Sequence, residues 1–198
     1  MLTRVLLLLA FMLVVAVIDR YRNGAKATRF QEYGFILFTG TIGAWLGGVN
    51  DYITSTISPE YFIFGKGLEP DHDFKIKTVL FGLGEGFSAG IMAGAACLFA
   101  ARHKSKHPTV PYRFLSKNTW LPVIGSILFG LAVPLMAQNF DPMNFAADLK
   151  ELMPAEKIQP FRTVWWTHTG LYLGATIGLI CLLAKIVKRR RGESIMAG

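Results

Sequence analysis

The sequence predicts an all-α integral membrane protein, a helical bundle of five transmembrane helices with short outer-surface helices in two of its loops. Three observations support this fold class. Of the 198 residues, 52% are hydrophobic and only 17% are charged, which is too apolar for an ordinary soluble domain. The apolar residues form continuous runs, and a helix needs about 20 residues to cross a bilayer. The basic residues favour alternate connections between these runs, as expected for a chain that crosses a membrane repeatedly.

Five apolar runs are the candidate spans of one transmembrane domain covering residues 1–198. They comprise residues 5–18, 33–50, 79–101, 121–137 and 164–187. Helices are expected because the runs lack the apolar and polar alternation of a membrane β-barrel. The first run is short and superficially resembles a signal peptide. We expect it to be retained, since its use as a leader would export the four basic residues of segment 19–32.

The distribution of charge predicts the orientation of the spans. Segments 19–32, 102–118 and 185–198 hold fourteen of the twenty-one Lys and Arg residues and only three carboxylates. The other two connections hold nine acidic and six basic residues. Under the positive-inside rule the N-terminus lies outside and the C-terminus in the cytoplasm, in a bacterial inner membrane. The net charge of +8 is explained in this way, so no nucleic-acid partner is expected.

Glycine spacing predicts how the spans pack, because close backbone approach drives helix association in lipid. Two spans carry glycines in tandem at every fourth position: Gly86, Gly90 and Gly94 on the third, and Gly170, Gly174 and Gly178 on the fifth. The second span adds Gly40, Gly43 and Gly47. We therefore expect spans two, three and five to form a tight core, with the first span and the Pro134-containing fourth span more peripheral. The alternative is that glycine is simply common in membrane helices.

Two connections carry signals for short helices on the outer side. Ser58-Pro59-Glu60 has the form of a helix start with Ser58 as N-cap, and the helix should continue through residues 61 and 62. Asp141-Pro142 should open an amphipathic surface helix, in which apolar residues recur at helical spacing. These apolar residues are Phe145, Leu149, Leu152 and Met153.

Ionisable residues inside the spans are the strongest functional candidates, because each costs about 2.5 to 3.5 kcal/mol at mid-membrane. Glu85 lies in the outer half of the third span, His168 lies near the outer end of the fifth, and Asp51 follows the second span on the same side. The glycine faces would bring these three residues into one polar pocket open to the outside. The alternative is a structural role, in which Glu85 and His168 only hydrogen-bond neighbouring helices.

A resemblance adds to this prediction. The string NDYITSTISPEYF at residues 50–62, the glycine-rich span after it and the late Trp165-x-x-His168 resemble a group of bacterial multi-span membrane proteins that share this loop and are uncharacterised in function. The resemblance implies a multi-pass membrane protein and carries over no activity. It adds Glu60 to Asp51, Glu85 and His168 as a candidate for binding a ligand or an ion.

Three functions from different classes fit these residues. The favoured one is a non-enzymatic accessory subunit that binds a ligand or a partner, the partner being another membrane protein or a second copy of the chain in the lipid bilayer. The first alternative is a proton- or cation-coupled transporter or channel. The second is a membrane enzyme acting on a lipid or a lipid-linked substrate, with His168 and Glu85 as acid and base or as metal ligands. No cofactor and no resident metal is expected, since only one histidine lies inside a span.

Overall fold

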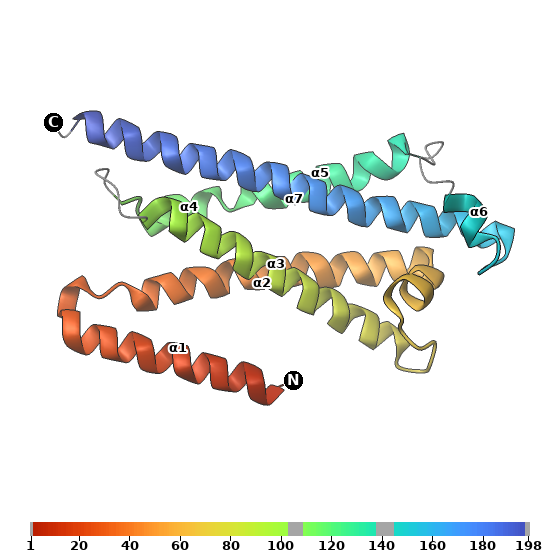
Figure 1. Ribbon diagram of the computed structural model, residues 1–198, viewed down its shortest axis with the longest axis horizontal. Coiled ribbons are helices and arrows are strands. Elements are labelled where there is room, and N and C mark those ends of the chain that lie inside the picture. Colours follow the sequence, from red (N-terminus) through yellow and green to blue (C-terminus); the bar gives the residue numbers. More distant parts are fainter. Residues whose placement is uncertain (1, 103–108, 138–144, 197–198) are drawn as a thin grey trace.

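All regular secondary structure in the described part of the chain is helical, which confirms the all-α prediction. Figure 1 shows the computed structural model, which describes residues 2–102, 109–137 and 145–196. Within these ranges there is no β-strand. The elements in chain order are α1 (Leu2–Asn23), η1 (Gly24–Lys26), α2 (Arg29–Ile57), η2 (Tyr61–Gly65), α3 (Phe74–Arg102), α4 (Tyr112–Asn118), α5 (Trp120–Met136), α6 (Phe145–Leu149) and α7 (Ala155–Met196).

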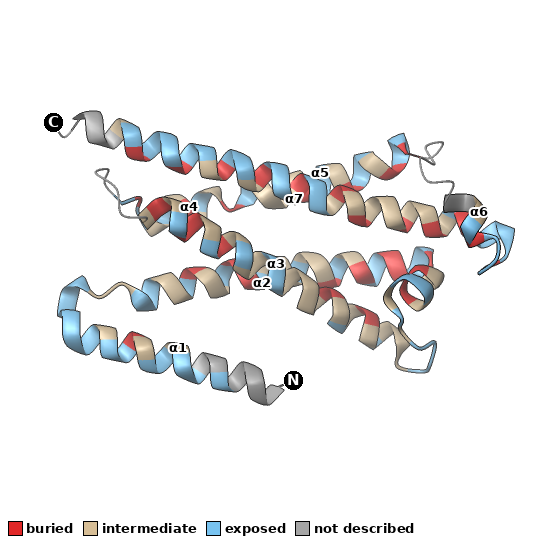
Figure 2. Cartoon of the chain, viewed as in Figure 1, coloured by how far each residue is buried: buried red, intermediate tan, exposed pale blue. Residues whose placement is uncertain are grey.

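Three helical stretches are long and apolar enough to cross a membrane: Phe74–Arg102, Tyr112–Met136 and Ala155–Gly192. Large apolar side chains remain exposed on them, including Leu80, Phe99 and Leu135, each more than 60% accessible. Figure 2 shows how much of the helical surface is exposed. Water would disfavour so much apolar surface, whereas lipid tails cover it without cost. The fold is therefore that of a membrane protein.

The helices α2 and α3 form a tightly packed hairpin whose backbones touch through glycine. A Cβ atom placed on Gly43 would lie 2.2 Å from the carbonyl oxygen of Gly86, and one on Gly47 would lie 2.2 Å from that of Gly82. A Cβ on Gly90 would lie 2.3 Å from the carbonyl oxygen of Thr39. These contacts leave no room for a side chain at the crossing, so glycine is required there.

The helices α5 and α7 form a second hairpin of the same kind. A Cβ on Gly174 would lie 2.1 Å from the carbonyl oxygen of Gly125, and one on Gly170 would lie 2.3 Å from that of Phe129. Gly178 meets the backbone of Leu121 and Pro122, at the start of α5. The expectation that the fourth span is peripheral and that the fifth joins the second and third in one core is therefore wrong. The reason is that α5 supplies its own small residue, Gly125, opposite the α7 glycines.

Two apolar clusters hold the hairpins together, one at each end of the molecule. The first cluster, near α4, joins residues of α2, α3 and α7 and consists of Phe35, Cys97, Leu98, Ala101, Val110, Leu115, Leu182 and Ile186. The second cluster, near η2 and the start of α7, consists of Tyr61, Phe62, Leu149, Met153, Ile158, Phe161 and Val164.

The connections differ in detail from the sequence prediction. The helix α2 continues to Ile57, so Ser58 ends a helix, and its hydroxyl donates to the Glu60 carboxylate at 3.0 Å. The helix that follows is a single π-helical turn, η2. In the other connection Leu149 and Met153 are buried in the second apolar cluster, so these two residues face protein rather than the membrane surface. The expected helix start at 141–142 lies outside the described residues.

The helix α1 lies at the periphery, as Figure 1 shows, and packs against α2. Its end is joined to α2 through Asp19, whose carboxylate accepts hydrogen bonds from the backbone N–H groups of Thr28 (2.9 Å) and Arg29 (3.1 Å). The turn between them uses Gly24, which has a positive φ of 54° that glycine adopts without strain. Asp19 thus supplies from α1 the cap that the first N–H groups of α2 need.

Candidate functional site

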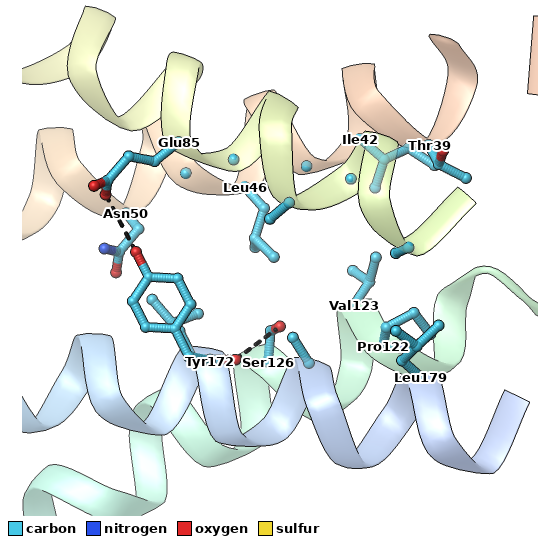
Figure 3. Close-up of a pocket in the computed structure, with 18 of the residues that line it drawn as sticks. Thr39, Ile42, Leu46, Asn50, Glu85, Pro122, Val123, Ser126, Tyr172 and Leu179 are labelled. Atoms are coloured by element: carbon cyan, nitrogen blue, oxygen red, sulfur yellow. Dashed lines mark hydrogen bonds between the residues drawn. The ribbon is translucent and has the colours of Figure 1, made fainter. Parts of the chain in front are cut away.

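A cavity of about 140 Å³ lies between the two hairpins. Its wall comes from α2, α3, α5 and α7 and is mostly apolar, with glycine and alanine contributing much of it. Figure 3 shows Leu46 reaching into the middle of this space, with Ile42 and Val123 toward one end. A dry apolar cavity of about 150 Å³ is large enough to hold benzene. This inter-hairpin cavity therefore has the size of one small ring.

The other end of the cavity is polar. The side chains of Asn50, Asp51, Glu85, His168 and Tyr172 line it, and we call this set the polar end. Figure 3 shows Asn50, Glu85 and Tyr172 gathered there, from α2, α3 and α7. The structure thus brings Asp51, Glu85 and His168, which the sequence singled out, to one cavity.

Asp51 and His168 are in direct contact and are both buried. The Oδ1 atom of Asp51 lies 3.0 Å from Nε2 of His168, and the two residues are 2% and 5% exposed. Asp51 comes from α2 and His168 from α7, so the contact joins the two hairpins.

The second ring nitrogen of His168 fixes the orientation of the imidazole. Its Nδ1 lies 2.9 Å from the carbonyl oxygen of Val164, one turn earlier in α7. Because a carbonyl oxygen only accepts hydrogen bonds, Nδ1 carries a proton and donates it. The ring also stacks on Tyr61, with centroids 4.7 Å apart and planes inclined by 26°. The Nε2 atom is therefore held toward Asp51.

Asn50 completes this arrangement. Its side-chain Nδ2 lies 3.1 Å from Oδ1 of Asp51 and also 3.1 Å from Nε2 of His168. An amide nitrogen has two N–H groups, so it can donate one hydrogen bond to each of these atoms. The sequence analysis did not include Asn50 among the candidates, although its position next to Asp51 indicated that it would share the site.

The other carboxylate oxygen of Asp51, Oδ2, is buried and has no hydrogen-bond partner. It lies against the backbone of α3, where a Cβ on Gly82 would come within 2.7 Å of it. An ionised carboxylate normally has donors on both oxygens when it is buried, because an unsatisfied charge is costly. Asp51 is thus an unusual group, buried with one oxygen paired and the other without a donor.

Glu85 lies in a different environment, in which a cation neutralises it. Lys66 donates to both carboxylate oxygens at 2.9 and 3.1 Å, and the Tyr172 hydroxyl donates to Oε2 at 3.2 Å. The Glu85 side chain is 36% exposed and that of Lys66 is 17% exposed. Sequence reasoning missed Lys66 because it directly follows η2 in a connection, where no helical period predicts the place of its side chain.

Glu60 lies apart from the cavity. Its carboxylate pairs with Lys157 of α7 at 3.1 Å and accepts the hydroxyl of Ser58. Burial raises the pKa of Glu60, but hydrogen bonds from its own backbone N–H, Lys157 and Ser58 outweigh this effect and lower the pKa below its ordinary value. The structure therefore places Glu60 in a contact between η2 and α7 and not with the other three candidates.

Comparisons with known proteins add no counterpart for this site. No protein-family model, no curated protein and no solved structure matches the chain. The class of protein is defined by the structure itself, as an all-helical chain with three helices long and apolar enough to cross a membrane. Its distinguishing feature is a ring-sized cavity between two glycine-packed hairpins, with a buried Asp51–His168 contact at one end.

Proposed function

We propose that the protein is a five-span integral protein of a bacterial inner membrane that binds a small lipid-soluble ligand between its two hairpins. The five spans are α1, α2, α3, α5 and α7, with the N-terminus outside and the C-terminus in the cytoplasm. Support comes from the alternation of basic and acidic connections and from the pairing of α2 with α3 along its length. Kinship with the bacterial proteins that share the 50–62 string is part of this proposal and supplies no activity.

The single observation that supports ligand binding is the inter-hairpin cavity, which has one apolar end and one polar end. Well-packed proteins rarely leave a space larger than a water molecule, and each void costs stability. Here a partly open cavity lies between two hairpins, within each of which the backbones touch through glycine. An apolar wall with a few convergent polar groups is the usual form of a small-molecule site. The ring of the ligand would occupy the apolar part and a hydrogen-bonding group would face the polar end.

A small photoreactive probe tests this proposal directly. We would use a phenyl diazirine, which has one ring and no charge, with the protein in lipid nanodiscs, and map the labelled residues by mass spectrometry. Saturable labelling of cavity residues such as Ala93 and Val123, competed by benzene, is expected. Labelling that is confined to lipid-facing residues, or that does not saturate, would contradict the proposal.

A pair of matched variants separates the cavity from the lipid surface. Ala175 lines the cavity on α7, whereas Ala184 is exposed on the same helix and does not line it. We expect Ala175→Phe to fill the space and abolish saturable labelling, while Ala184→Phe leaves it unchanged. Equal labelling of both variants would show that the probe binds elsewhere.

One observation favours a second candidate, a proton- or cation-coupled transporter. The Asp51–His168 contact joins a buried carboxylate on α2 to a buried imidazole on α7. A movement of either hairpin relative to the other would therefore change this contact. Purified protein in liposomes should then show flux of a proton or cation that falls severalfold in Asp51→Asn. Absence of any flux in the wild-type protein would remove this candidate and leave ligand binding untouched.

A further inference from the structure

The side chains at the polar end of the cavity use their hydrogen-bond donors on other protein groups. The amide nitrogen of Asn50 has two N–H groups and lies 3.1 Å from Oδ1 of Asp51 and 3.1 Å from Nε2 of His168. Both N–H groups are therefore engaged. The Tyr172 hydroxyl donates to Oε2 of Glu85 at 3.2 Å. Neither Asn50 nor Tyr172 has a side-chain hydrogen left for a ligand.

The His168 imidazole and the two carboxylates offer no donor either. Nδ1 of His168 donates to the carbonyl oxygen of Val164 at 2.9 Å. Nε2 faces the Asn50 amide and Oδ1 of Asp51, at 3.1 and 3.0 Å, so both ring nitrogens have protein partners. The carboxylates of Asp51 and Glu85 are hydrogen-bond acceptors. The side chains of the polar end thus present only lone pairs to the cavity.

The hydroxyl groups elsewhere in the cavity wall also donate to the protein. Each bonds a backbone carbonyl oxygen: Thr39 that of Ile36 at 2.9 Å, Thr119 that of Leu115 at 3.0 Å, and Ser126 that of Leu171 at 3.2 Å. Lys66 donates to Glu85 but does not line the cavity, and its Nζ lies over the ring of Phe81, 5.0 Å from the centroid. The side chains of the wall therefore keep no free donor.

Two acceptor atoms at the polar end have no partner. Oδ2 of Asp51 is buried without a hydrogen bond, and the side-chain carbonyl oxygen of Asn50 accepts none from the described residues. Both residues line the cavity. A buried acceptor without a donor costs free energy, because it has lost its hydrogen bonds to water. A ligand that donates a hydrogen bond here removes part of this cost, whereas a ligand that only accepts adds another unpaired acceptor.

We propose that the inter-hairpin cavity selects ring compounds that carry a hydrogen-bond donor, such as a hydroxyl group, over those whose polar group only accepts, such as a ketone. This inference rests on the proposed function, because it names the class of ligand for the same cavity. The hydroxyl group would lie at the polar end beside Asn50 and Asp51. The ring would lie beside Leu46, which Figure 3 shows in the middle of the cavity. Small alcohols and phenols belong to the selected class, and ketones and quinones do not.

The test compares three compounds with the same ring and the same number of non-hydrogen atoms. Cyclohexanol carries a donor, cyclohexanone only accepts, and methylcyclohexane has no polar group. Their affinities are measured by competition with the diazirine probe on the protein in nanodiscs, and are referred to the concentration of each compound in the bilayer. Cyclohexanol should bind about tenfold more tightly than cyclohexanone, because an unpaired buried polar group is costly. Cyclohexanone should bind no better than methylcyclohexane.

The variant Glu85→Gln supplies a donor at almost unchanged side-chain size. Its amide nitrogen either faces the cavity or donates to the Tyr172 oxygen, which frees the hydroxyl hydrogen for the ligand. The affinity for cyclohexanone should therefore rise about fivefold, and methylcyclohexane should bind as in the wild-type protein. The matched control is Glu69→Gln, because Glu69 is exposed in the connection before α3 and does not line the cavity. This control should leave all three affinities unchanged.

The outcomes separate the ligand site from its selectivity. If none of the three compounds competes with the probe, the proposed function fails and the selectivity fails with it. If methylcyclohexane competes but cyclohexanone binds as tightly as cyclohexanol, the selectivity is overturned while the ligand site remains. An unchanged preference for cyclohexanol over cyclohexanone in Glu85→Gln would likewise show that donors at the polar end do not determine which ligand binds.

Discussion

Asp51 on α2 and Gly82 on α3 face each other so closely that no side chain fits at position 82. A Cβ there would lie 2.7 Å from both Cγ and Oδ2 of Asp51 and 2.5 Å from the carbonyl oxygen of Gly47. The same glycine therefore closes the hairpin and sets the position of the carboxylate that faces His168. Packing and the candidate site are linked through this one residue.

We expect Gly82→Ala to destabilise the protein, because the added methyl group must displace either backbone or the buried carboxylate. Overpacking of this kind costs about 1 to 3 kcal/mol. The free energy of unfolding in mixed detergent micelles measures the effect. The matched control is Gly84→Ala on the same helix, where nothing lies within 4 Å of the added atom, and its stability should be unchanged or slightly higher. Equal effects of the two variants would contradict the close approach.

Lys66 and Glu85 should couple only weakly. Their side chains are 17% and 36% exposed, and partly exposed ion pairs contribute about 0.2 to 1 kcal/mol. A double-mutant cycle with Lys66→Met and Glu85→Gln measures the coupling free energy. A value above about 3 kcal/mol, typical of a pair buried away from solvent, would show that the polar end is drier than the exposures indicate.

Glu60 should make the protein less stable in acid. Its pKa in the folded protein lies below the ordinary 4.5, since hydrogen bonds to the carboxylate outweigh the opposing effect of burial. The stabilisation is present above the unfolded pKa and is lost as the pH falls through the folded pKa. Thermal unfolding of Glu60→Gln should therefore show a smaller loss of stability between neutral pH and pH values below 4.5. Glu69→Gln, in the same connection, should retain the wild-type dependence.

The proposed orientation predicts opposite results for two reporter fusions. Alkaline phosphatase is active only outside the cytoplasm, so its insertion in the loop 67–71 should give an active enzyme. A green fluorescent protein at the C-terminus should fluoresce, because it matures in the cytoplasm. The reverse pattern would contradict the orientation inferred from the basic connections, whereas the fold would be unaffected.

Much of the helical organisation could be predicted from the sequence because hydrophobic runs depend only on local composition. Each of the five predicted runs lies within a helix except for its last residue in one case, Ala137, which ends α5 as a turn. Glycine spacing identified the faces at which backbones approach. It could not identify the partner of each face, since any small-residue face accepts any other, and so it did not predict that α7 pairs with α5.

The candidate site was predictable in part for the same reason. The depth of Asp51, Glu85 and His168 along their helices is a local property, and the structure places all three at one cavity. The contacts of Lys66 with Glu85 and of Tyr61 with His168 depend on how the connection around η2 folds back onto the bundle. The course of this connection is set by the tertiary packing of the second apolar cluster. The spacing of apolar residues in the sequence does not predict that packing.

The glycine contacts within each hairpin have a mechanical consequence. Separating α2 from α3, or α5 from α7, would pull apart backbones in direct contact, whereas the two hairpins meet through side chains in the apolar clusters and through the contacts around Asp51 and His168. Side chains can change rotamer and slide, but touching backbones can only part. Each hairpin should therefore move as a rigid unit. Any widening of the molecule should occur at the interface between the hairpins, where the inter-hairpin cavity already lies.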